Sequence, residues 1–287
     1  MISFVNAKIN LGLRVVERLP SGYHRLETIF YPVGLYNGTP ECPYPLCDIL
    51  EATPSKEFSL EQSGEQATSD PCDNLVYKAW ELFSEYCHSH RKQISPFVMR
   101  LEKHLPMQAG MGGGSADASS ALRLYNHLNG NLLSDEELKS LALKIGADCP
   151  FFLLNKPALA GGIGEELIPL AERLKGMWCA IAKPAENMST KEAFARITPS
   201  GKENELETIY KGEMAEWRTL MENDFEEPFF ALYPHCRKIK ERFYDSGALY
   251  SSLSGSGGAF YALFPDHDSA LAALHRQTTP YKALALL

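Results

Sequence analysis

The sequence predicts an α+β fold in two domains, residues 1–158 and 159–287. The chain has 287 residues, and because domains cluster near about 100–150 residues, two are expected. Hydrophobic residues make up 45% and charged residues 22% of the chain, which supplies a packed core and excludes a disordered chain. The first residues alternate with the period of two that is typical of strands. Helical patterns then alternate with further strand patterns along the rest of the sequence.

The charge balance excludes a general attraction for nucleic acids or anionic membranes. The net charge is −8, whereas both partners reward a basic face. No apolar run reaches the roughly 20 residues that span a bilayer, and Asn6, Lys8 and Asn10 interrupt the stretch where a signal peptide would be apolar. We therefore expect a cytoplasmic protein in which a local binding site holds any anionic ligand.

The cysteine pattern predicts neither a disulfide framework nor a zinc site. The chain has 7 cysteines, scattered and never spaced C-x-x-C. Cys87, His88 and His90 form a tight Cys/His group, but side chains two residues apart diverge on a helix. We expect this group to be a polar helix end.

The first elements form a predicted hairpin. Residues 2–15 alternate as a strand, which places Lys8 and Asn10 on the same face. Residues 23–31, rich in aromatic and branched side chains, follow a Pro-Ser-Gly turn as the second strand. Tyr23 and His24 should lie at its mouth.

Residues 37–72 are rich in Pro, Ser, Glu and Cys and predict loops with one strand near residues 57–60. Asp73 is the predicted cap of a helix that runs to Tyr86. Ser134 and Glu137 form a capping box for a later helix that stops at Gly146. The other predicted elements up to residue 158 are a strand over 97–102, a helix from the glycine run to residue 129, and a strand over 151–154.

Beyond residue 158 the patterns predict a second strand-and-helix series. The predicted strands cover residues 177–182, 248–253 and 259–264, and the predicted helices lie near residues 190–197, 215–232 and 236–244. A further glycine-rich loop, residues 254–258, separates the last two strands.

The glycine run before the helix at residue 115 predicts a phosphate site. Gly110, Gly112, Gly113 and Gly114 let the backbone approach a ligand and aim free N–H groups and the positive helix end at it. The alternative is that the glycines only allow close packing. No Gly-Lys-Ser/Thr follows, so the loop is not a Walker A motif, and Ser115 replaces the third glycine of a dinucleotide fingerprint. The chain also lacks the H-R-D and D-F-G motifs of protein kinases.

Phosphoryl transfer needs neutralised phosphate charge and a group that orients the acceptor hydroxyl. The residues themselves offer Ser115 at the loop end, Lys8 on its strand face, and Asp117 or Asp148 as the carboxylate. An ordinary surface lysine and a turn aspartate remain the alternatives for Lys8 and Asp148 at this point.

Two segments together resemble the GHMP kinase superfamily of small-molecule kinases. Residues 106–118 are similar to its phosphate loop, and residues 253–257 to its third motif. The resemblance implies a two-domain α+β fold, with an N-terminal phosphate-loop domain and a C-terminal α/β sandwich, and it implies ATP and a divalent metal, Mg²⁺, as cofactors. The implied nucleotide-binding residues are Asn74, Lys103, Pro106, Met107, Gln108, Ala109, Gly110, Met111, Gly112, Gly113, Gly114, Ser115 and Ala116; those of the third loop are Ser254, Gly255, Ser256 and Gly257, and Ser115 is a candidate metal contact.

Within the superfamily, the chain resembles the branch that acts on a cytidine diphosphate alcohol of non-mevalonate isoprenoid synthesis. The matching segments are residues 7–11, 22–24, 28–30, 146–151, 162–165 and 223–226. The resemblance implies that Asp148 takes or orients the proton of a tertiary 2-hydroxyl, and that Lys8 keeps Asp148 ionised and favours alkoxide character on the acceptor. It implies cytidine contacts from Tyr23 and His24, an opposite stacking face from Phe194, and a substrate contact from Asn10. Asp117 is expected to be structural.

The sequence departs from the motifs of this family at several positions. Gln108 replaces a small residue, Ala116 removes one hydroxyl ligand, and Gly161 stands where a charged residue is usual. The Cys- and Pro-rich stretch 37–47 has no family counterpart. A homoserine or mevalonate type of GHMP kinase, or a non-catalytic sensor of the same fold, are the competing hypotheses.

Overall fold

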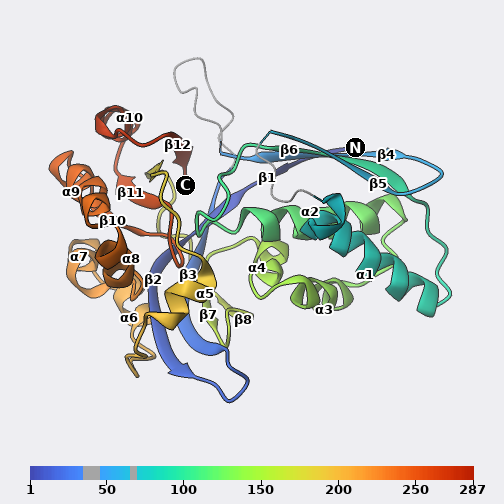
Figure 1. The fold of residues 1–287 in the computed structure, drawn as a ribbon, viewed down its shortest axis with the longest axis horizontal. Helices are drawn as coiled ribbons and strands as arrows, with labels where there is room; N and C mark the ends of the chain where they lie inside the picture. The colour runs from blue at the N-terminus through green and yellow to red at the C-terminus, as the bar shows by residue number, and fades with distance from the viewer. Residues whose placement is uncertain (35–45, 65–69) are drawn as a thin grey trace. The chain divides into compact units, whose positions relative to one another are not determined.

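A computed structural model describes residues 1–34, 46–64 and 70–287, which divide into two compact units. Unit 1 comprises residues 1–7, 47–107 and 112–155, and unit 2 comprises residues 108–111, 156–287 and the described part of 8–46. The mixture of helices and strands confirms the α+β class (Figure 1). A boundary near residue 158 stays a prediction, because unit 2 draws chain from both sides of it. The 37–47 stretch lies almost entirely outside the described residues.

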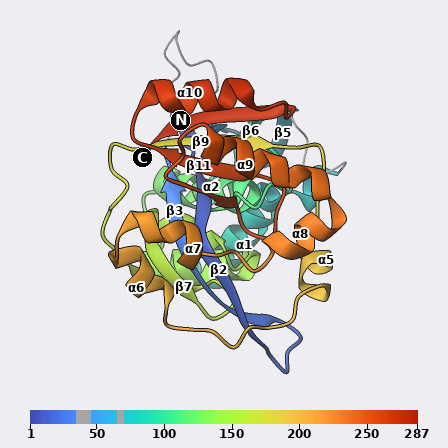
Figure 2. The ribbon, with the colours of Figure 1, turned by 90° about the vertical axis from the view of Figure 1, so that its left-hand side faces the viewer.

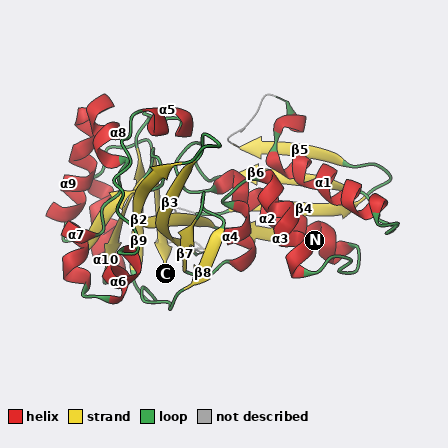
Figure 3. Ribbon diagram, turned by 90° about the horizontal axis from the view of Figure 1, so that it is seen from below, coloured by secondary structure: helices red, strands yellow, loops and turns green. Residues whose placement is uncertain are grey.

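Unit 1 is a four-stranded sheet with helices on one face (Figures 1 and 3). The strand order is β1-β4-β6-β5, with β5 parallel to β6 and the other pairs antiparallel. Helix α2 packs on β1 and β4. The bounds are β1 (Ile2–Val5), β4 (Asp48–Pro54), β5 (Ser59–Gly64), η1 (Pro71–Asp73), α1 (Leu75–Ser89), β6 (Phe97–Lys103), α2 (Gly113–Leu128), α3 (Asp135–Ile145) and α4 (Cys149–Leu154).

Unit 1 corrects three predictions. Asn74, not Asp73, caps α1, because the Asn74 side chain accepts the backbone N–H of Val76. The expected strand over residues 151–154 is the helix α4, and β4 was not predicted. The capping box of Ser134 and Glu137 is confirmed, as is the end of α3 at residue 146.

Unit 2 contains two further four-stranded antiparallel sheets. One has the order β2-β3-β7-β8 and the other β10-β11-β9-β12. Helix α10 packs on β9, while α9 packs on β10 and β11 (Figure 2). The strands are β2 (Ala7–Arg18), β3 (His24–Val33), β7 (Ala158–Gly161), β8 (Glu166–Pro169), β9 (Trp178–Lys183), β10 (Tyr250–Leu253), β11 (Phe260–Phe264) and β12 (Tyr281–Leu286). The helices are α5 (Thr190–Ala195), α6 (Leu206–Lys211), η2 (Met214–Glu216), α7 (Trp217–Leu220), α8 (Glu226–Leu232), η3 (Pro234–Cys236), α9 (Arg237–Asp245) and α10 (His267–Arg276).

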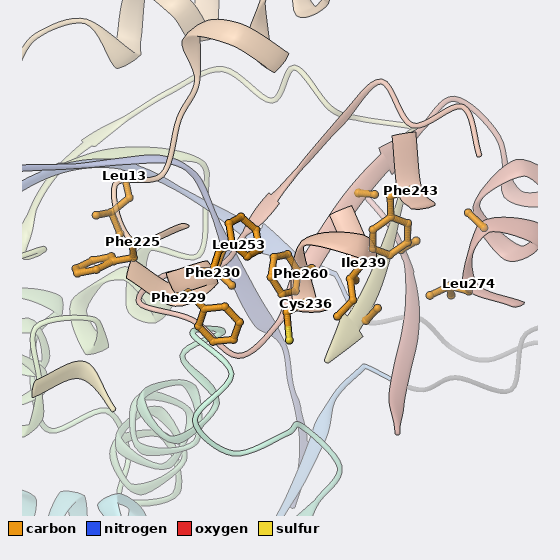
Figure 4. Packing of buried hydrophobic residues seen from close by; sticks show 14 of the residues in the cluster. Leu13, Phe225, Phe229, Phe230, Cys236, Ile239, Phe243, Leu253, Phe260 and Leu274 are labelled. Atoms are coloured by element: carbon orange, nitrogen blue, oxygen red, sulfur yellow. The ribbon is translucent and has the colours of Figure 1, made fainter. Parts of the chain in front are cut away.

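The core of unit 2 joins the first hairpin to the end of the chain. Leu13 and Val15 of β2 are buried in one cluster with Leu253, Phe260 and other residues of the C-terminal sheet and its helices (Figure 4). The predicted hairpin is confirmed, although Asn6 separates β1 from β2. No helix among the described residues has the length and apolar content needed to cross a bilayer.

Candidate active site

A row of buried polar side chains crosses β2 and β3 in unit 2. Lys8 and Asn10 are only 3% and 1% exposed. The Lys8 ammonium donates to Asn10 Oδ1 at 2.6 Å, and Asn10 Nδ2 donates to Thr28 Oγ1 at 3.0 Å. The Thr28 hydroxyl donates in turn to the carbonyl of Gly12 at 2.6 Å.

The row is braced from both sides. The ammonium of Lys8 lies 4.7 Å from the centre of the Phe30 ring, and the Tyr261 hydroxyl donates to the backbone carbonyl of Asn10 at 2.6 Å. The shared face of Lys8 and Asn10, predicted from the strand period, is confirmed. A lysine is almost never fully buried unless its charge is paired or hydrogen-bonded. The hydrogen bonds of this row therefore hold the Lys8 ammonium in a fixed position.

Aromatic rings gather where β3 begins. The His24 ring stacks on Phe194 of α5 with centroids 4.6 Å apart and planes at 15°, and Phe225 meets Phe194 edge-on at 5.0 Å. A base between two rings needs roughly 7 Å, twice the contact distance of carbon atoms, so it does not fit between His24 and Phe194. Tyr23 is 62% exposed and offers a ring face to a ligand.

His24 is set up as a neutral hydrogen-bonding group. Partial burial, followed by the nearby charge of Arg18, lowers the pKa of His24 from its ordinary 6.5. The neutral imidazole has one donor and one acceptor nitrogen, which suits the edge of a nucleobase.

Within unit 2, the two glycine loops predicted from the sequence pack against each other. Ser254 Oγ donates to the carbonyl of Gly110 at 2.9 Å, and the Ala259 N–H donates to the carbonyl of Ala109 at 3.1 Å. Gly110 has a φ of +70°, and a Cβ there would lie 1.9 Å from the carbonyl oxygen of Ser254. Only glycine allows this approach. Asn223 supports the third loop by donating to the carbonyls of Leu253 and Gly255 at 2.8 and 2.9 Å.

The rest of the phosphate loop belongs to unit 1 and starts α2. Gly112 occupies the N-cap with a φ of +70° and provides no capping side chain. The first N–H groups of this 16-residue helix are therefore left for a ligand at its positive end. The half-buried Ser115 sits in this first turn, and its contact with a phosphate or a phosphate-bound ion stays a prediction.

Lys103, predicted to lie on the nucleotide side, is part of a buried ionic cluster in unit 1. Its ammonium binds the carboxylates of Asp48 and Asp117, the latter at 2.7 Å. Burial acts to lower the pKa of Lys103, but the two carboxylates outweigh it and raise that pKa. Burial raises the pKa of Asp117 to about 8, although Lys103 opposes the shift. Asp117 is buried on α2 and paired with Lys103; its structural role and the nucleotide contact of Lys103 stay predictions.

Asn74 and Asp148 are placed by helix starts in the same unit. Asn74 caps α1 and donates to Gln62 Oε1 at 2.8 Å. Asp148 occupies the N-cap of α4 without making a capping bond, and it is half-buried. Its carboxylate is therefore not used to start the helix. The roles of Asn74 and Asp148 in binding and catalysis stay predictions.

Comparisons with known proteins decide the family. Residues 74–156 match the GHMP kinases N terminal domain, and residues 206–282 match the GHMP kinases C terminal domain. The 4-diphosphocytidyl-2-C-methyl-D-erythritol kinase of Bacteroides fragilis is 42% identical over 268 residues, covering 92% of each chain. The enzyme of that name from Bacteroides thetaiotaomicron is 43% identical over 265 residues, again covering 92% of each chain.

The chain belongs to the 4-diphosphocytidyl-2-C-methyl-D-erythritol kinase family of GHMP kinases. A crystal structure of 4-(cytidine 5'-diphospho)-2C-methyl-D-erythritol kinase superposes with a TM-score of 0.78 at 30% identity, covering 99% of this chain and 98% of that one. A homoserine kinase from Cytophaga hutchinsonii shares the fold alone, with a TM-score of 0.66 at 17% identity over 95% of this chain and 88% of that one. The family resemblance predicted from the motifs is therefore confirmed, and the chain is an ATP-dependent small-molecule kinase.

Sequence reasoning missed several residues that contact the predicted site residues within each unit. Thr28 stands in a segment already matched to the family, so its proximity to Asn10 could have been found from hairpin pairing. Asp48 and Tyr261 left no local signal, because they lie 55 and 251 residues from Lys103 and Asn10.

Proposed function

We propose that the kinase transfers the γ-phosphate of ATP to the 2-hydroxyl of 4-diphosphocytidyl-2-C-methyl-D-erythritol, giving the 2-phosphate and ADP. The relatives at 42% and 43% identity carry this substrate in their name. The reaction belongs to non-mevalonate isoprenoid biosynthesis, and we expect it to take place in the cytoplasm.

One observation carries the choice of an elongated nucleotide substrate. The base-reading ring and the polar row lie on the same hairpin, since His24 and Thr28 both belong to β3. They are four positions apart on the strand, which separates them by roughly 13 Å at about 3.3 Å per residue. A cytidine diphosphate alcohol has a base at one end and the acceptor hydroxyls at the other, so it can engage both.

The proposed chemistry uses few protein groups. The acceptor oxygen forms a bond to the γ-phosphorus as the bond to the ADP oxygen breaks, and the hydroxyl proton passes to the Asp148 carboxylate. Lys8 favours the negative charge that develops on the acceptor oxygen, and Asn10 orients the alcohol. A tertiary alcohol is a hindered nucleophile, so positioning supplies a large share of the rate enhancement.

The donor set of the phosphate loop fits a magnesium ion held mainly by ATP. Magnesium prefers oxygen ligands and usually keeps several waters while binding substrate phosphates. Ser115, half-buried in the first turn of α2, would contribute one hydroxyl oxygen, and Ala116 contributes none. When bound, the ion would neutralise phosphate charge.

An ADP-release assay with ATP and magnesium tests the proposal. The acceptors compared are 4-diphosphocytidyl-2-C-methyl-D-erythritol, its uncytidylated phosphate, homoserine and mevalonate. We expect turnover with the cytidylated alcohol alone. Turnover of another acceptor would contradict a cytidine-binding role for Tyr23 and His24. Binding of ATP and the cytidylated alcohol without turnover would favour a non-catalytic sensor.

A further inference from the structure

A second group of ligating side chains lies in unit 2, apart from the residues assigned to the kinase reaction. Glu186 belongs to the loop between β9 and α5, whereas His235 and Cys236 belong to η3. His235 Nε2 lies 2.7 Å from Glu186 Oε1, and one ligand atom from each of the three residues lies within 4.8 Å of the others. Among residues 1–34, 46–64 and 70–287, no other such group of three could hold a metal ion.

We propose that Glu186, His235 and Cys236 bind one zinc ion. Thiolate, imidazole and carboxylate are the ligands that zinc takes in proteins, at about 2.0–2.3 Å from the metal. Ligands at those lengths around a tetrahedron stand roughly 3.5 Å apart, so small side-chain adjustments bring the three atoms to coordinating distance. Three protein ligands leave the fourth position to water.

Zinc binding replaces the proton of the Cys236 thiol by the metal ion. On binding, the thiol releases its proton to solvent while the imidazole donates the Nε2 lone pair and keeps its proton on Nδ1.

The two segments are already held side by side. The Tyr233 hydroxyl donates to the carbonyl of Asn187 at 2.9 Å, which fixes the loop against the start of η3. Cys236 packs in the core cluster beside Phe260 (Figure 4), while His235 is exposed on the outer side. The thiol thus approaches the ion from the core and the imidazole from solvent. Spacing rules did not reveal this group, because Glu186 is far away in sequence and no C-x-x-C motif is present.

An ion at this position would restrain the segment that leads into α5. That helix begins four residues after Glu186 with Thr190, whose hydroxyl lies 3.3 Å from that of Ser256 in the third glycine loop. The helix also carries Phe194, the ring stacked on His24. Zinc should therefore favour binding of the cytidylated alcohol. This consequence rests on the proposed function, whereas zinc binding itself does not.

Cobalt(II) titration of the full-length, untagged, reduced and metal-free protein tests the site. We expect one equivalent to bind with a thiolate-to-cobalt charge-transfer band and the intense visible bands of tetrahedral cobalt, all lost on adding zinc. His235→Ala should weaken binding at least tenfold. Because His235 is 64% exposed, this variant tests the proposal even if Cys236→Ser, which should abolish the charge-transfer band, fails to fold.

His90→Ala and Cys72→Ser are the matched controls, since both side chains are exposed and lie outside the proposed site. Both should bind cobalt like the unmodified protein. A titration without a charge-transfer band, or a band unchanged in His235→Ala, would overturn the site. A KM for the cytidylated alcohol that is the same with and without zinc, at constant magnesium, would overturn only the effect on α5.

Discussion

At the scale of single residues, Asp148 is the sharpest test of the proposed chemistry. Asp148→Asn keeps the shape of the side chain but cannot accept the hydroxyl proton. We expect kcat to fall by about 10²–10⁴, the usual contribution of a general base, while both KM values change little. Steady-state ADP release measures this.

The control for Asp148 is Asp135→Asn. Asp135 is an exposed aspartate in the first turn of α3, so its substitution should leave kcat unchanged. If Asp148→Asn retained a kcat within twofold of the unmodified enzyme, Asp148 would not be the base.

Titration of His24 should make the KM for the cytidylated alcohol depend on pH, but not the KM for ATP. Its pKa is lowered from 6.5, so the imidazole stays neutral at pH 7 and gains a proton only at a lower pH than an ordinary histidine. Protonation removes the acceptor nitrogen. The KM for the cytidylated alcohol should therefore rise as the pH falls through that pKa, by about fivefold for one hydrogen bond near 1 kcal/mol.

His24→Asn offers a comparison that keeps a donor and an acceptor but does not titrate. In this variant the KM for the cytidylated alcohol should stay flat over the same pH range. The KM for ATP should not follow the titration in either protein, and an ATP KM that rose in parallel would assign the effect to another group.

At the scale of loops and helices, Gly110 tests the packing of the two glycine loops. In Gly110→Ala the new Cβ would meet the carbonyl oxygen of Ser254 at 1.9 Å. Gly247→Ala shares the positive φ, at +89°, but has nothing within 4 Å. Both variants pay a backbone cost of about 1–2 kcal/mol, and Gly110→Ala should lose a further 1–3 kcal/mol or so from overpacking.

Urea unfolding measures both costs, and the KM for ATP reports on the loop itself. We expect the KM for ATP to rise in Gly110→Ala and to stay the same in Gly247→Ala. Equal free energies of unfolding in the two variants would contradict a packing role for the contact between Gly110 and Ser254.

The elements show where sequence reasoning succeeds and where it fails. The strand period placed Lys8 and Asn10 on one face, because side-chain direction along a strand is a local property. Residues 151–154 are a short apolar run, which periodicity cannot assign to a helix or a strand. Two features favour the helix α4: Pro150 lies in its first turn, where proline is tolerated, and the hydroxyl of Ser119 on α2 donates to the Cys149 carbonyl at 2.8 Å.

The site divides in the same way. Motifs predicted the phosphate loop and the aromatic residues at the hairpin, since each is a local run of residues with its own chemistry. The Asp48 carboxylate that binds Lys103, and Glu186 of the proposed zinc site, come from segments distant in sequence from their partners. Only the three-dimensional arrangement brings such residues together.

At the scale of the whole molecule, the chain passes between the two units at residues 7–8, 46–47, 107–108, 111–112 and 155–156. A fragment of residues 156–287 would therefore lack β2 and β3, which the N-terminal residues supply to unit 2. Strand β7 pairs with β3, and the core cluster includes Leu13 and Val15 of β2.

This arrangement predicts that residues 156–287 do not fold alone. The isolated fragment would leave the edge of β7 unpaired and the core open where Leu13 and Val15 belong. It should therefore show no cooperative urea transition and little near-ultraviolet circular dichroism. Residues 8–34 joined to 156–287 by a flexible linker restore both strands, so this control should unfold cooperatively. A cooperative transition in the fragment alone would instead make the boundary near residue 158 a true folding boundary, with the hairpin an addition to a core that is already complete.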